Sequence, residues 1–134
     1  MKKEFVPYEQ ALELKQLGFD EECFAGYDIY TTELYIGYEI DQRTFNIEYY
    51  ILTPLYQQVF RWFREKYGLI GNVNDNCILE NTYSISISKI FDSRILYVNG
   101  RNHNLKDKQG FTTYEDAELE CLKKLIEIVK DGKK

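Results

Sequence analysis

Apolar residues recur at every second position in two regions of the chain, each made of two segments joined by polar residues. This pattern limits most strongly how the chain can fold. Residues 34–40 alternate in this way, and residues 45–51 repeat the pattern after a short polar turn at 41–44. Residues 83–88 alternate apolar side chains with serine, and residues 94–98 return after a second polar pair. A period of two is typical of a strand with one buried face, so each stretch predicts an antiparallel β-hairpin.

Helical spacing surrounds these stretches in three places. The first helix is predicted to begin at Pro7 and to stop at Gly18, since proline suits a first turn and glycine a C-terminal cap. The second is predicted to have Thr53 as its N-cap and to stop at Gly68. The third follows Thr113 and carries acidic residues in its first turn, where they favour the helix dipole.

These elements predict an α+β fold in the order α-ββ-α-ββ-α. No long βαβ crossover is required, so a small antiparallel sheet of two hairpins packed against three helices is the expected architecture. The length of 134 residues fits a single domain over 1–134. Residues 131–134 are expected to form a disordered tail, because they are polar and include glycine.

Charge is divided unevenly along the chain. Residues 1–50 carry eleven acidic and four basic side chains, a net charge of −7, whereas the remainder carries +2. Contacts to nucleic-acid phosphates require lysine and arginine, so the acidic half disfavours nucleic acid as a partner.

No group of residues predicts catalysis or a cofactor. The single histidine, His103, would need one of three scattered cysteines beside it for nucleophilic catalysis, and no such motif is present. No zinc spacing occurs, and the polar run 71–76 lacks the glycine and glutamate of a calcium loop, so it is predicted to be a polar turn. The sequence therefore predicts a non-enzymatic protein without catalytic residues, metal or cofactor.

Cysteine usage and hydropathy predict a cytoplasmic protein. The three cysteines are odd in number, no signal peptide is recognised at the N-terminus, and no apolar run approaches the length of a membrane span.

Tyrosines provide the main candidate binding site. Seven of the twelve tyrosines fall within thirty residues, and in two-faced strands some of them must lie on the solvent side. Exposed Tyr35 or Tyr50 beside Glu33 or Glu48 would form a protein-binding patch, because aromatic side chains anchor interfaces. The alternative is that these tyrosines cover a sheet as cross-strand pairs.

A second candidate is a mildly basic helix face. Arg61 and Arg64 share this face with Lys66 and two glutamines, and it would suit phosphate or an acidic partner. The alternative is an ordinary solvated helix face.

Three blocks of the sequence, which cover the helical regions, resemble small phage-related proteins. They are Phe5-Val6-Pro7-Tyr8-Glu9-Gln10-Ala11 with Leu17-Gly18-Phe19-Asp20-Glu21, the segment from Pro54 to Gly68, and the segment from Thr113 to Glu127. In combination they resemble uncharacterised proteins encoded by Bacteroidetes phages, prophages and mobile elements. The resemblance implies action in the bacterial cytoplasm and brings no activity and no site residues.

The sequence thus predicts a phage or prophage accessory protein that binds a host or phage protein. The alternatives are a small-ligand or nucleotide-binding protein that sequesters its ligand, and a nucleic-acid mimic formed by the acidic half. Pairing of two copies through a strand edge would be a further possibility, but nothing in the sequence specifies the oligomeric state.

Overall fold

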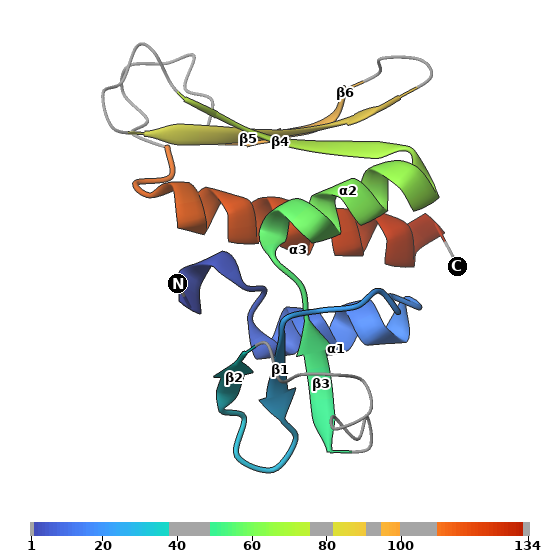
Figure 1. The fold of residues 1–134 in the computed structure, drawn as a ribbon. Coiled ribbons are helices and arrows are strands. Elements are labelled where there is room, and N and C mark those ends of the chain that lie inside the picture. Colours follow the sequence, from blue (N-terminus) through green and yellow to red (C-terminus); the bar gives the residue numbers. More distant parts are fainter. Residues whose placement is uncertain (1, 38–48, 76–81, 91–94, 100–109, 133–134) are drawn as a thin grey trace. The chain divides into compact units, whose positions relative to one another are not determined.

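A computed structural model describes residues 2–37, 49–75, 82–90, 95–99 and 110–132. Within these residues the chain forms three α-helices and two three-stranded antiparallel sheets, in the order α-βββ-α-βββ-α (Figure 1). The predicted α+β class with antiparallel pairing is confirmed. The two predicted hairpin regions lie in two separate sheets. Each sheet has three strands, one more than the sequence predicted.

The chain divides into two compact units, residues 1–59 and 60–134, with the boundary inside α2 (Tyr56–Tyr67). This division matches the distribution of charge. Residues 51–59 carry no charged side chain, so the first unit has the net charge of −7 and the second unit +2. The single domain expected over 1–134 stays a prediction.

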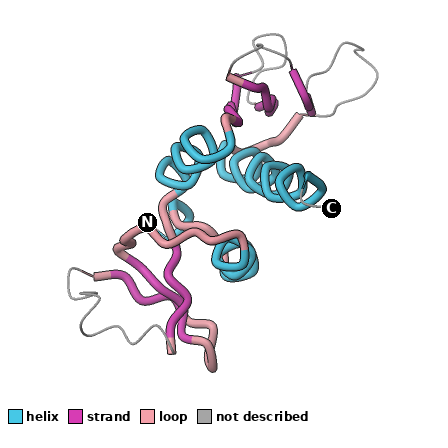
Figure 2. The backbone as a smooth tube through the Cα atoms, turned by 90° about the vertical axis from the view of Figure 1, so that its right-hand side faces the viewer, coloured by secondary structure: helices cyan, strands magenta, loops and turns pink. Residues whose placement is uncertain are grey.

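In the first unit, β1 lies in the middle of the sheet β2-β1-β3 (Figure 2). The elements are η1 (Lys2–Glu4), α1 (Tyr8–Gln16), β1 (Ala25–Asp28), β2 (Leu34–Ile36) and β3 (Tyr50–Thr53).

The predicted pairing between 34–40 and 45–51 is wrong for the described parts of these strands, because β2 and β3 each pair with β1 instead. The predicted turn at 41–44 lies outside the described residues. Alternation did not reveal β1, because it is only four residues long and contains Gly26.

One face of this sheet forms part of the core of the first unit. Ala25, Tyr27, Ile51 and Thr53 are buried on it. Helix α1 covers this face, as shown by its contacts with β3 and by the edge contact between the rings of Tyr8 and Tyr27, whose centroids are 5.6 Å apart. Because side chains alternate along a strand, the residues between these positions lie on the opposite face.

Thr53 has a different role from the predicted N-cap. It ends β3, and α2 begins only at Tyr56. Its hydroxyl donates a hydrogen bond to the carbonyl oxygen of Val6 at 2.6 Å, and the Tyr27 hydroxyl donates to the same oxygen at 2.9 Å. The N-cap prediction is wrong because the Thr53 hydroxyl hydrogen-bonds this buried carbonyl, which is distant in sequence, and does not cap the helix.

The predicted helix stops and the third helix start are confirmed. Gly18 and Gly68 adopt positive φ angles of 95° and 64°, which glycine adopts without strain. The Thr113 hydroxyl oxygen accepts a hydrogen bond from the backbone N–H of Asp116 at 3.1 Å, as an N-cap does.

In the second unit, β4 (Leu69–Asp75), β5 (Tyr83–Lys89) and β6 (Ile95–Asn99) form a sheet in that order. The predicted pairing of 83–88 with 94–98 is confirmed by β5 and β6.

The prediction of a polar turn at 71–76 is wrong, since all of its described residues belong to β4. Asn72 and Asn74 can occupy a strand because they are exposed and lie opposite Ser86 and Ser84 in the register, away from the buried face.

Helix α3 (Tyr114–Gly132) packs against β4 and β5 and runs along this sheet in Figure 1. The approach is close at Gly71, where an added Cβ would lie 2.9 Å from Sγ of Cys121 and 3.0 Å from Cδ1 of Leu125. The helix also includes Asp131 and Gly132, which the sequence placed in a disordered tail. Residues 133–134 of that tail lie outside the described residues.

Candidate protein-binding face

The outer face of the sheet β2-β1-β3 carries the tyrosines singled out by the sequence. In the antiparallel register Gly26 lies opposite both Tyr35 and Leu52, and Asp28 lies opposite Tyr50. Cross-strand partners point to the same side of a sheet. We call these five residues the tyrosine face. Tyr35 is 45% exposed and Tyr50 is half-buried, whereas the inner face packs against α1 at β3, although Ile36 at its edge is 39% exposed.

Tyr35 and Tyr50 meet across the middle strand. Their ring centroids are 6.1 Å apart and their planes are nearly perpendicular, at 88°, which is a favourable edge-to-face arrangement. Gly26 belongs to the strand between them and has no side chain, so the two rings can approach each other above β1. The glycine therefore allows two neighbouring strands to present one aromatic pair.

Glu33 lies at the rim of the tyrosine face. The Tyr35 hydroxyl donates a hydrogen bond to Oε2 of Glu33 at 3.3 Å. This hydrogen bond, together with the negative charge of Glu33, raises the pKa of Tyr35 above its ordinary value. The phenol therefore stays neutral at physiological pH, with a carboxylate beside it. Glu48, the other predicted acidic neighbour, lies outside the described residues.

A second pair of tyrosines consists of Tyr30, in the turn between β1 and β2, and Tyr49, just before β3. Oδ1 of Asp28 accepts hydrogen bonds from the backbone N–H groups of Tyr30 at 2.7 Å and Thr31 at 3.0 Å, an arrangement that favours a tight turn. Tyr30 is 77% exposed and Tyr49 is 47% exposed, and their ring centroids are 6.5 Å apart. These two rings form a separate exposed aromatic pair.

Sequence reasoning missed the contributions of Gly26 and Asp28. The turn chemistry of Asp28 could have been read from an aspartate that precedes Tyr-Thr-Thr, because aspartate often hydrogen-bonds the backbone two residues onward. The role of Gly26 has no local signal, because it depends on which strands lie on either side of it.

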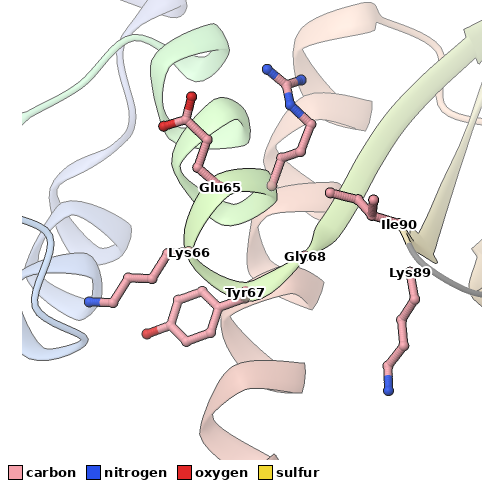
Figure 3. Close-up of a pocket in the computed structure, with 7 residues that line it drawn as sticks. Glu65, Lys66, Tyr67, Gly68, Lys89 and Ile90 are labelled. Atoms are coloured by element: carbon pink, nitrogen blue, oxygen red, sulfur yellow. The ribbon is translucent and has the colours of Figure 1, made fainter.

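Arg61 and Arg64 are exposed on α2 and belong to the second unit, whereas the tyrosine face belongs to the first. A pocket of about 530 Å³ lies at the C-terminal end of α2 (Figure 3). It is lined by Arg64, Glu65, Lys66, Tyr67, Gly68, Lys89 and Ile90.

The cationic groups of this pocket do not converge on one point. In Figure 3 the side chains of Lys66 and Lys89 start at separate places and their ammonium groups end apart from each other. The Lys66 ammonium group lies 5.0 Å from the Trp62 ring centroid and 5.6 Å from that of Tyr67, so it makes cation–π contacts within the protein. Arg64 and Lys66 also lie in the last turn of α2, where positive charge favours the helix dipole. The cation–π contacts and the helix dipole therefore explain the positions of Arg64 and Lys66 without a bound ligand.

Cys23 and Cys121 are poor candidates for a nucleophile. Both are buried, and burial raises the pKa of each thiol to about 12, with a further contribution from the charge of Glu21 or Glu118 respectively. The reactive species of a cysteine is its thiolate, which is scarce at neutral pH when the pKa is raised. Cys77 and His103 lie outside the described residues.

We expect Cys23 and Cys121 to resist modification in the folded protein. In a Cys77→Ser variant, a thiol reagent such as 5,5′-dithiobis(2-nitrobenzoate) should label neither thiol at mildly alkaline pH until denaturant is added. The same variant in denaturing urea is the control and should release colour for both thiols. Rapid labelling of either thiol without denaturant would contradict the burial described above.

Among the described residues, no group of three or more histidine, cysteine, aspartate or glutamate side chains is placed to hold a metal ion. No helix in that part of the chain is long and apolar enough to cross a membrane.

Comparisons with protein-family models, with curated proteins and with solved structures find no match to this chain. Its function must therefore be inferred from its own residues, above all from the tyrosine face.

Proposed function

We propose that this chain is a non-enzymatic accessory protein that binds another protein through the tyrosine face. The observation that carries the proposal is the aromatic pair of Tyr35 and Tyr50 on the side of the sheet opposite the one that packs against α1. Two further exposed tyrosines, Tyr30 and Tyr49, form a second aromatic pair in the same unit. Clustered apolar surface marks interaction sites more often than isolated exposed residues do, and tyrosine is enriched among residues that dominate binding energy.

The geometry of the pair also favours binding. The Tyr35 ring is held by its edge contact with Tyr50 and by the hydrogen bond from its hydroxyl to Glu33. A side chain that is already ordered loses little conformational entropy when a partner covers it. The same contacts would also suit a pair of tyrosines that simply covers the sheet, so the exposed fraction of Tyr35 is the feature that favours binding.

The cellular setting is part of this proposal. The helical blocks resemble proteins of Bacteroidetes phages, prophages and mobile elements, so we place the protein in the bacterial cytoplasm. Its partner would then be a host protein or another phage protein.

Affinity capture from cells of the native host tests the proposal. The tagged wild type should retain a protein in stoichiometric amount, and Tyr35→Ser combined with Tyr50→Ser should lose it. Tyr114→Ser is the matched control, because Tyr114 is a tyrosine that is 45% exposed and begins α3 in the second unit. This control should retain the partner, and circular dichroism should show that all variants are folded. Equal capture by the double variant and the wild type would contradict the proposal.

A second candidate function is nucleotide binding at the pocket beside α2. Three cationic side chains, those of Arg64, Lys66 and Lys89, line this pocket together with the Tyr67 ring, and such groups can contact phosphate and base. A nucleotide that raises the melting temperature of the wild type, but not that of Lys89→Gln, would support this function. Absence of stabilisation by any nucleotide in a panel would count against it.

A further inference from the structure

Among the described residues, the charged side chains on and beside the tyrosine face are acidic. Asp28 belongs to this face and Glu33 contacts Tyr35 at its rim. The described cationic residues of the first unit are Lys2, Lys3 and Lys15, which lie on η1 and α1 and not on the sheet. Helix α1 covers the opposite, inner face of the sheet, and the first unit as a whole carries a net charge of −7.

Negative charge attracts cations, and the aromatic pair of Tyr35 and Tyr50 adds to that attraction. The face of a tyrosine ring is electron-rich, and a cation placed over it is attracted by the ring quadrupole. Tyr35 is exposed and has the Glu33 carboxylate at its hydroxyl end. A planar guanidinium group could therefore stack on the ring and lie close to the carboxylate, a combination of contacts that arginine makes better than lysine.

We infer that the partner of the tyrosine face is a protein that presents an arginine-rich basic segment. This inference rests on the proposed function and names the chemistry of the partner. A purely apolar partner fits less well, because it would remove the charged carboxylates of Asp28 and Glu33 from water without supplying a positive charge to pair with them. An acidic partner would be repelled by the same carboxylates and by the net charge of the first unit.

Synthetic peptides test the inference directly. We would titrate the protein with three peptides of equal length, built from Arg-Gly, Lys-Gly and Glu-Gly repeats, and follow the tyrosine ring resonances by NMR. The Arg-Gly peptide should bind about two- to fivefold more tightly than the Lys-Gly peptide for each stacked side chain, and the Glu-Gly peptide should not bind. Binding should weaken as salt is added, because exposed charges are screened.

The Glu33→Gln variant tests the negative charge of Glu33 separately from its hydrogen bond with Tyr35. Glutamine retains an oxygen that can accept the hydrogen bond from the Tyr35 hydroxyl, but it removes the negative charge. We expect this variant to bind the Arg-Gly peptide more weakly than the wild type does, with the melting temperature unchanged. Equal binding of the Arg-Gly and Glu-Gly peptides, or of the variant and the wild type, would overturn the inference.

The two proposals fail in different ways. A captured partner that depends on Tyr35 and Tyr50, but is insensitive to Glu33→Gln and to salt, would overturn the arginine-rich partner and leave the proposed function standing. A captured partner that is indifferent to the two tyrosines would overturn the proposed function itself.

Discussion

Replacing Phe63 by alanine is expected to lower the free energy of unfolding by about 3–5 kcal/mol, the usual cost of truncating a fully buried aromatic residue. Phe63 is 0% exposed, and its ring centroid lies 5.0 Å from that of Trp62 and 5.9 Å from that of Tyr67. Truncation removes the transfer free energy of the ring and leaves a cavity beside these neighbours. The shift of the urea unfolding midpoint, at an unchanged slope, measures this loss.

Phe24→Ala is the matched control for this prediction. Phe24 is 64% exposed, so the same change in chemistry should alter the unfolding free energy by no more than about 0.5 kcal/mol. Equal losses for the two variants would contradict the assignment of Phe63 to the core.

Replacing Gly71 by alanine is expected to cost about 1–3 kcal/mol, the typical cost of adding a carbon to a well-packed core. The new Cβ would lie 2.9 Å from Sγ of Cys121, which is closer than real contacts allow, and 3.0 Å from Cδ1 of Leu125. The end of the leucine side chain can move, but the short cysteine side chain is fixed against the strand. Thermal unfolding monitored by circular dichroism measures the loss.

Cys121→Ala should partly rescue the Gly71→Ala variant, because it removes the sulfur atom that the new Cβ meets. The double variant should lose less stability than the sum of the two single variants, with an interaction energy of about 0.5 kcal/mol or more. Gly132→Ala is the control, because nothing lies within 4 Å of a Cβ added there. Strict additivity of the two changes would show that α3 does not approach β4 at this point.

Local signals in the sequence predicted those parts of the fold that local chemistry decides. Gly18, Gly68 and Thr113 end or begin helices because their own backbone freedom or hydroxyl satisfies the helix end. The pairing of β5 with β6 was predictable because serine alternates with apolar residues along β5. These features need no information from distant parts of the chain.

The parts that were missed depend on distant partners. Asparagine and aspartate favour turns and so predict one at 71–76, yet the seven-residue pairing of β4 with β5 and its packing against α3 outweigh that preference. The local sequence predicts that Thr53 caps a helix, because nothing near it reveals the Val6 carbonyl that accepts the hydrogen bond from its hydroxyl. Tertiary contacts override local propensity in both cases.

The candidate site shows the same division. The suggestion that Tyr35 lies exposed beside Glu33 came from strand alternation alone, which places neighbouring residues on opposite faces. The contact of Tyr35 with Tyr50 above Gly26 could not be foreseen, because β1 was not recognised as the strand between β2 and β3.

Photo-crosslinking from position 35 tests the central claim most directly. Tyr35 would be replaced by the photoreactive amino acid p-benzoylphenylalanine, and the protein would be irradiated in cells of its native host. Tyr114, which like Tyr35 is 45% exposed, lies on α3 in the second unit and provides the matched control position. We predict a discrete crosslinked protein from position 35 that position 114 does not give. No crosslinked protein from position 35, or the same set of proteins from both positions, would contradict a protein-binding tyrosine face.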